Sequence, residues 1–273
     1  MIERISDEEL EALIQAMHNR YGLDFSNYEK KSFKRSIVRL MMKNKMTSML
    51  ELWGRIIKDK QFFLDSIDDL LVNLTELFRN PDAWIMIRDK ILNKFDDKPQ
   101  LKIWHAGCST GEEVYTMGIV LEEKKLLPKV STLATDLSSL ALSKAIKGEY
   151  SLLIIKQYLK PFLEFYPNRQ MEDFFDFNDK FAVIKDDYKK HVRFLNHNLV
   201  HDGMEEKFDI IFCRNVMIYF DEQLKVQVLN LFNKCLRPGG YLVIGYYDIM
   251  PDAGKELFEA FDIRTRIYSK RNN

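Results

Sequence analysis

Apolar residues recur at helical spacing through roughly the first eighty positions of the chain. The segment DEELEALIQAMHNRYG is preceded by Ser6, has Glu9 in position for a capping box, and ends at Gly22, so it predicts a helix. A second helix is expected over residues 27–46, and SMLELWGRIIKDK and QFFLDSIDDLLVNLTELF continue the pattern. Residues 1–80 are therefore predicted to form an all-helical domain.

After Pro81 the pattern changes to helices alternating with short apolar strands, which is typical of a doubly wound α/β sheet. Strands are expected at Leu101, in VSTLATD, in KFDIIFC and in LRPGGYLVIG, and the last segment, ELFEAFDIRTRIYSK, predicts a helix and an edge strand. Residues 81–273 are therefore predicted to form a Rossmann-like domain.

Within that domain, residues 151–197 read as an insertion, because the periodicity breaks down and aromatic residues accumulate. The short alternating runs FFDF, KFAVI and HVRFLNHNL predict a small antiparallel β-ribbon. Its exposed edge would either bind a peptide by strand addition or serve as a simple structural flap.

The stretch LKIWHAGCSTGEEVY predicts a buried strand, a glycine-bearing turn and a helix start in succession. Gly107 and Gly111 allow the backbone to turn sharply, and Ser109 or Thr110 is able to cap the helix. The carboxylates at 112 and 113 would repel a pyrophosphate at a helix N-terminus, but they suit a sulfonium or ribose hydroxyl groups. S-adenosylmethionine therefore fits this turn better than NAD does.

Asp136 lies about twenty-odd residues beyond the glycine turn, at the predicted carboxyl end of the second strand. An acid at this position hydrogen-bonds ribose hydroxyl groups in Rossmann-like folds. The alternative is that Asp136 caps the helix LSSLALSKAIKGEY.

The composition argues against several classes of partner and site but does not indicate a function. Lys plus Arg and Asp plus Glu both number 41, so the overall charge does not predict a nucleic-acid partner. Cys108, Cys213 and Cys235 have no metal-ligand spacing, which predicts reduced thiols in a cytoplasm and no metal site. Because the acidic N-terminus lacks a signal-peptide pattern and no apolar run would span a bilayer, we expect neither export nor membrane insertion.

The second predicted helix carries a local charge pattern that the totals hide. Lys31, Arg35, Arg39 and Lys43 follow one another at i,i+4, a row of like charges that repel in the isolated helix. This row is either a solvated face or a docking surface for an acidic partner.

Several motifs together resemble the CheR-type chemotaxis receptor methyltransferases, which methylate glutamates on bacterial chemoreceptors. The matching segments are NLTELFR from Asn73, STGEEVY from Ser109, ATD ending at Asp136, GEY from Gly148, NL from Asn198 and FCRNVMIYF from Phe212. The resemblance covers nearly the whole chain, and FCRNVMIYF is its most specific piece.

The resemblance implies both a site and a partner. It implies that the cofactor S-adenosylmethionine, which leaves as S-adenosylhomocysteine, is contacted by Asn73, Thr75, Arg79, Glu113, Asp136, Asn198, Leu199, Asn215 and Val216. It also implies that Arg79 and Tyr219 lie beside the transferring methyl and the acceptor carboxylate. The helical domain would then hold the cytoplasmic helical bundle of a chemoreceptor, with the enzyme expected to be a monomer.

The chain departs from the family pattern in two places. Leu77-Phe78-Arg79 replaces the common FFR, and Gly245-Tyr246-Tyr247-Asp248 replaces glycine-histidine-serine-glutamate. The second change leaves open a methyltransferase with a different protein acceptor. Two other functions also compete with the leading one: a cofactor-binding signalling module, and a small-molecule methyltransferase, which would not need the basic helical domain.

Overall fold

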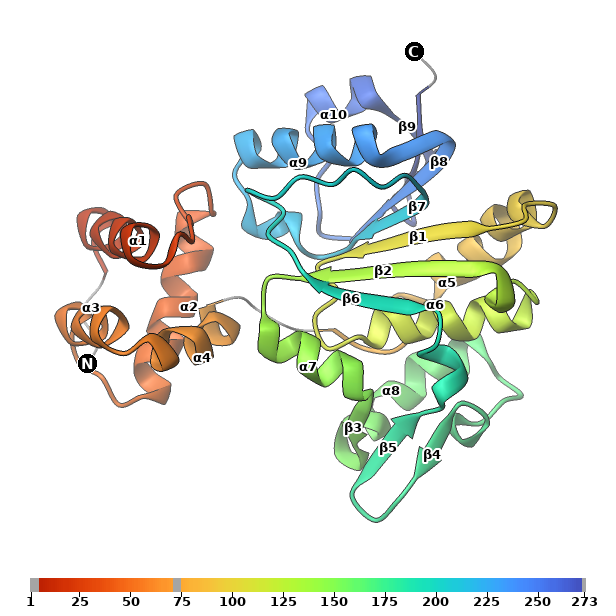
Figure 1. The fold of residues 1–273 in the computed structure, drawn as a ribbon, viewed down its shortest axis with the longest axis horizontal. Coiled ribbons are helices and arrows are strands. Elements are labelled where there is room, and N and C mark those ends of the chain that lie inside the picture. The colour runs from red at the N-terminus through yellow and green to blue at the C-terminus, as the bar shows by residue number, and fades with distance from the viewer. Residues whose placement is uncertain (1–4, 71–74, 272–273) are drawn as a thin grey trace.

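The structure is a computed structural model that describes residues 5–70 and 75–271. Its N-terminal part is a cluster of helices beside a larger α/β unit (Figure 1). The helices are α1 (Asp7–Tyr21), α2 (Lys30–Lys43), α3 (Met49–Lys58) and α4 (Lys60–Leu70). The capping box of Ser6 and Glu9 is present and Gly22 ends α1 in the left-handed conformation, as predicted.

Three predicted helix boundaries in this part are wrong. The second helix begins at Lys30 rather than residue 27, because the Glu29 side chain accepts hydrogen bonds from the first backbone N–H groups, and it ends at Lys43 rather than residue 46. The fourth helix does not continue to Phe78: residues 75–80 are not helical, and Phe78 has a φ of 54°. Leu77 and Phe78 are instead buried in the core of the α/β unit.

The α/β unit is built on a seven-stranded sheet with the order β6-β2-β1-β7-β8-β10-β9. Its strands are β1 (Leu101–Ala106), β2 (Val130–Asp136), β6 (Val192–Asn196), β7 (Phe208–Cys213), β8 (Leu236–Ile244), β9 (Phe258–Asp262) and β10 (Ile267–Lys270). Neighbours from β6 to β8 pair in parallel, whereas β10 is antiparallel to both β8 and β9. The predicted Rossmann-like fold is confirmed.

Helices cover both faces of the sheet (Figure 1). They are α5 (Pro81–Met86), α6 (Glu112–Glu123), α7 (Ser139–Lys147), α9 (Glu222–Cys235) and α10 (Asp252–Leu257). The alternation of side chains along β7 separates two cores: Ile210 packs in the core that contains α5 and α6, and Ile211 packs in the core that contains α9. Among the described residues, no helix is long and apolar enough to cross a membrane.

The predicted antiparallel insertion is present, but parts of its surroundings differ from the prediction. Strands β3 (Glu149–Ser151), β5 (Phe181–Ile184) and β4 (Phe175–Phe177) form a three-stranded antiparallel sheet. The run HVRFLN is not part of it, because β6 pairs in parallel with β2 at the edge of the main sheet. A helix that was not predicted, α8 (Leu152–Phe165), also lies in this region.

The C-terminal segment contains one strand more than predicted. After α10 the chain forms a β9–β10 hairpin, in which β9 is the edge strand and β10 lies between β9 and β8.

Candidate active site

A pocket opens beyond the carboxyl ends of β1, β2 and β7. Strand β1 has β2 on one side and β7 on the other, so the strand order reverses direction at this point of the sheet. This switch point is the usual ligand position in doubly wound folds. The predicted site residues that line the pocket are Thr75, Arg79, Glu113, Asp136, Asn198, Leu199, Asn215, Val216 and Tyr219. Asn73 lies outside the described residues.

The turn after β1 carries the backbone across the floor of this pocket. Gly107 and Gly111 have φ values of 85° and 92°, which only glycine adopts readily, and Ser109 has a φ of 48°. Gly111 is the N-cap of α6 and makes no side-chain capping bond, so the prediction that Ser109 or Thr110 caps this helix is wrong.

Asp136 connects two loops at the end of β2. One carboxylate oxygen accepts a hydrogen bond from the Ser109 N–H at 2.7 Å, and the other accepts from the Ser138 N–H at 2.9 Å. Ser138, not Asp136, is the N-cap of α7, since its hydroxyl accepts from the Ala141 N–H. The alternative role of Asp136 as a helix cap is therefore wrong, and its buried carboxylate faces the pocket.

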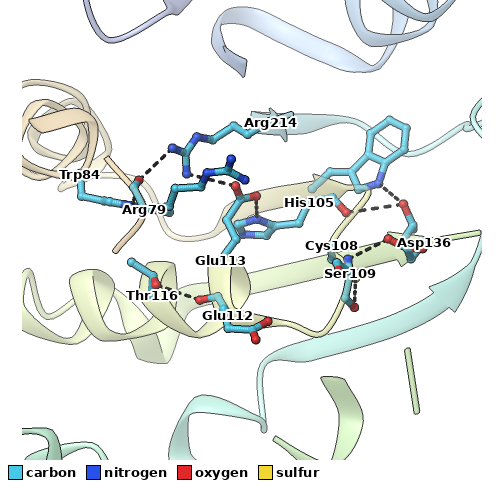
Figure 2. Close-up of polar contacts among 12 residues, drawn as sticks. Arg79, Trp84, His105, Cys108, Ser109, Glu112, Glu113, Thr116, Asp136 and Arg214 are labelled. Carbon is cyan, nitrogen blue, oxygen red and sulfur yellow. Dashed lines mark hydrogen bonds and ion pairs between the residues drawn. The ribbon is translucent and has the colours of Figure 1, made fainter. Parts of the chain in front are cut away.

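Glu113 belongs to a buried charged network that fixes the backbone at Arg79 (Figure 2). Its carboxylate is 2.8 Å from His105 Nδ1 and 3.3 Å from Arg214 Nη1. Arg214 Nη2 donates to the Arg79 carbonyl and to Asn80 Oδ1, each at 2.9 Å. Burial alone would raise the pKa of Glu113, but the hydrogen bond from His105 and the charges of His105 and Arg214 lower it, so Glu113 stays ionised.

The neighbouring Glu112 lies apart from the pocket residues. Its carboxylate accepts hydrogen bonds from the hydroxyls of Tyr158 and Thr110, at 3.1 and 2.7 Å. Burial raises its pKa to about 6. Of the two carboxylates at the start of α6, only Glu113 lines the pocket.

The loop after β7 approaches the other strand ends closely. Asn215 has a φ of 60°, and a Cβ added at Gly245 would lie 2.5 Å from its backbone nitrogen. A Cβ added at Gly107 would likewise lie 2.5 Å from Val216 Cγ2. Glycine at both positions therefore allows Asn215 and Val216 to reach the pocket wall. The loop continues into a 3₁₀ turn, Met217–Tyr219.

The helical part of the chain supplies one wall of the pocket, which sequence reasoning missed. Tyr28 lines the pocket, forms a β-bridge with Phe220, and packs edge-on against its ring at 5.4 Å. The Glu29 N–H donates to the Tyr219 carbonyl at 2.8 Å. The sequence signal at Tyr28 is only an aromatic residue before a helix, which does not reveal this long-range contact.

The predicted basic row lies along the exposed side of α2. Lys31, Arg35 and Arg39 are exposed, whereas Lys43 makes an ion pair with Asp69 at 2.8 Å. One end of the row is thus balanced by an acid of α4.

The same row also reaches the site electrostatically. Burial raises the pKa of the Tyr219 hydroxyl, and the positive charges of Arg79, Arg39 and Arg35 oppose this rise. Arg35 and Arg39, in the middle of the basic row, are therefore near enough to Tyr219 to act on it, and Tyr219 remains a protonated hydrogen-bond donor at neutral pH.

The pocket has the chemistry that an adenosyl ligand requires. Asn215 Oδ1 and Ser109 Oγ are buried and have no hydrogen-bond partner among the described residues, so both are available to a ligand. The adjoining acids, Glu113 and Asp136, suit a cationic amine and ribose hydroxyl groups.

Comparisons with known proteins agree with this geometry. Residues 73–267 match the family described as "CheR methyltransferase, SAM binding domain", and residues 8–71 match "CheR methyltransferase, all-alpha domain". A Pseudomonas putida protein that carries the name methyltransferase Cher3 is 31% identical over 98% of both chains. The "Chemotaxis protein methyltransferase" of Listeria innocua is 32% identical over 82% of this chain and 83% of that protein. That of Borreliella burgdorferi is 34% identical over 89% and 88%.

The sheet order, the pocket at its switch point and the family matches define an S-adenosylmethionine-dependent methyltransferase. The chain belongs to the CheR methyltransferase family.

Proposed function

We propose that this protein transfers the methyl group of S-adenosylmethionine to glutamate side chains of chemoreceptors, which gives glutamate methyl esters. The observation that carries the proposal is the position of Arg79 and Tyr219 in the cofactor pocket, with the basic row of α2 beside them. In this assignment the helical domain of residues 1–80 docks the receptor and residues 81–273 form most of the cofactor site, to which Tyr28, Thr75 and Arg79 of the first part also contribute.

Different residues around the pocket would bind different parts of the cofactor. Asp136 would accept hydrogen bonds from the ribose, Asn215 would contact the adenosine, and Glu113 would hold the amino group. Thr75, Asn198, Leu199 and Val216 would complete the enclosure, together with Asn73. The cofactor supplies a methyl group on a sulfonium, which is already an activated leaving group.

The acceptor side needs positioning rather than a catalytic base. A glutamate side chain has a reference pKa of about 4.3, so it is ionised near neutral pH and is already a nucleophile. Arg79 would grip one carboxylate in two hydrogen bonds, and the protonated Tyr219 hydroxyl would donate a third. Alignment of this kind contributes up to about 7 to 11 kcal/mol, and exclusion of water protects a weak nucleophile.

The partner would be the cytoplasmic helical bundle of a chemoreceptor, which places the enzyme in the cytoplasm. A glutamate-bearing helix is acidic, and the exposed Lys31, Arg35 and Arg39 give α2 the complementary charge. We propose that the protein acts as a monomer, which would leave this face of α2 accessible to the receptor. The family names of the relatives, which include chemotaxis, support this choice over a small-molecule acceptor.

Transfer of radiolabelled methyl to cytoplasmic fragments of chemoreceptors from the source organism tests the proposal directly. We expect label that is released by mild base, as carboxyl methyl esters are, and that is lost with Asp136→Ala. Base-stable label, or label on other proteins alone, would show a different acceptor. Cofactor binding without label on any protein would favour a binding module.

Substitution of Arg79 tests its role beside the acceptor. Arg79→Lys keeps the charge but loses the planar fork, so we expect kcat to fall about tenfold or more. Because Arg79 is also a proposed cofactor contact, S-adenosylhomocysteine affinity should fall too, but by less than kcat. Arg264→Lys, at a side chain that is 84% exposed, is the matched control. Unchanged kcat in Arg79→Lys would exclude two-point recognition of the carboxylate.

A further inference from the structure

Asp248 is a buried carboxylate that ties together three backbone N–H groups at the wall of the pocket. One oxygen accepts from the N–H groups of Asn215 and Gly245, both at 2.7 Å, and the other accepts from the Ile218 N–H at 2.9 Å. Asp248 has 0% solvent exposure and does not itself line the pocket. The carboxylate therefore acts on the site only through the backbone that it holds.

The backbone that Asp248 holds, residues 215–219, carries the proposed cofactor contact Asn215 and the proposed acceptor contact Tyr219. Asn215 sits in the left-handed region, with a φ of 60°, which asparagine tolerates better than most residues with a side chain, and the hydrogen bond from its N–H to Asp248 holds it there. Ile218 belongs to the 3₁₀ turn that ends at Tyr219. Asp248 thus fixes the entry and the middle of this turn at once, while Gly245 keeps β8 close enough for the contact.

We infer that Asp248 is a positioning residue for the methyl-transfer site, which sets the carboxamide of Asn215 toward the cofactor and the hydroxyl of Tyr219 toward the acceptor. The inference rests on the proposed cofactor site but not on the identity of the acceptor. It also assigns a role to one residue of the segment 245–248, which departs from the family pattern: the acid at position 248 holds the backbone of the pocket wall by hydrogen bonds.

Asp248 is able to hold the three backbone N–H groups only when its carboxylate is ionised. An ionised carboxylate accepts all three hydrogen bonds, whereas a protonated one places an O–H donor against an N–H donor. Burial raises the pKa of Asp248 to about 6, against the three N–H groups and the charge of Arg214, which lower it. The other titratable groups that interact with it are Cys213 and Tyr219. Mild acid should therefore loosen the turn.

Calorimetric binding of S-adenosylhomocysteine tests the inference. For Asp248→Asn we expect the Kd at pH 7.5 to be about tenfold higher or more, because an amide offers one acceptor oxygen to three donors. We expect the Kd of the wild-type protein to rise as the pH falls below about 6, and this rise to be absent in Asp248→Asn. Asp248→Glu keeps the charge and should bind more tightly than Asp248→Asn.

Asp252→Asn is the matched control, since this aspartate of α10 is 96% exposed and should bind like the wild type. A role in stability alone would lower the Tm of Asp248→Asn but leave its Kd and the pH profile unchanged, and that result would overturn the inference. If Asp248→Asn does not fold, the pH dependence of the wild-type Kd for S-adenosylhomocysteine tests the inference alone. A wild-type Kd that stays constant from pH 5 to 7.5 would overturn the inference. Wild-type protein that does not bind S-adenosylhomocysteine would instead overturn the proposed function itself.

Discussion

Gly245 shows how one missing side chain shapes the candidate site. Its absent Cβ would lie 2.5 Å from the Asn215 nitrogen, so Gly245→Ala must displace the Asn215 loop. We expect the Kd for S-adenosylhomocysteine, measured by calorimetry, to rise about tenfold or more. Gly203→Ala is the control, because its Cβ would meet no atom within 4 Å. Equal affinity in the two variants would contradict a requirement for close approach at position 245.

Glu112 links burial to the pH dependence of stability. Its pKa is about 6 in the folded protein against an ordinary 4.5, so between these values the folded state binds more protons than the unfolded state. The Glu112 contribution therefore lowers the free energy of unfolding as the pH rises from about 4.5 to 6, by at most about 2 kcal/mol.

Replacement by glutamine removes this titration. The free energy of unfolding of Glu112→Gln minus that of the wild type should increase by up to about 2 kcal/mol between pH 4 and 7 and stay constant above that. Urea denaturation at several pH values measures this difference, with the exposed Glu164→Gln as the control. A difference that is the same at every pH would show that Glu112 titrates normally.

At the residue scale, sequence patterns located the acids and glycines of the pocket but not the groups that hold them. Asp136 was found because its distance from the glycine turn is characteristic, and the structure places it in the pocket. Arg214 holds the Arg79 carbonyl, 135 positions earlier in the chain, and Tyr28 comes from another part of the fold. Such contacts depend on tertiary packing, for which one sequence has no local signal.

At the element scale, helix α2 combines a buried apolar side with an exposed basic one, and the exposed side has a testable role. The double substitution Arg35→Glu, Arg39→Glu should raise the KM for an acidic receptor fragment about tenfold or more, and less at high salt. The Kd for S-adenosylhomocysteine should change little. Lys156→Glu, Lys160→Glu on the exposed side of α8 is the control for the same change in net charge. Equal KM values in both double variants would remove α2 from receptor recognition.

Helices and strands were predictable where the spacing of apolar residues and the capping residues indicated a single type of element. The capping box and terminal glycine delimited α1, and short segments rich in apolar and β-branched residues marked β1, β2 and β7. Helix α8 was missed because it carries apolar residues on both sides: Phe162 is buried, but Leu153 and Leu163 are 71% and 47% exposed. Strand β6 was recognised as a strand, yet alternation alone does not say which neighbour it pairs with.

At the scale of the whole molecule, the helical part and the α/β part share the wall of one pocket. Backbone hydrogen bonds join Glu29 to Tyr219 at 2.8 Å and Asp221 to Asn27 at 2.9 Å, on both sides of the Tyr28–Phe220 bridge. The turn that carries Tyr219 is therefore held from the α/β side by Asp248 and from the helical side by Glu29. Any displacement of the helices by a docked partner would be transmitted to this turn.

Tyr28 tests whether the two parts form the site together. Tyr28→Ala removes the ring that packs on Phe220 and opens the pocket to water, so we expect the Kd for S-adenosylhomocysteine to rise about tenfold and kcat to fall. Tyr28→Phe keeps the ring and should stay within about threefold of the wild type. If both variants bind and turn over like the wild type, the helical part acts only in docking. If only Tyr28→Ala is impaired, both parts of the chain build the methyl-transfer site.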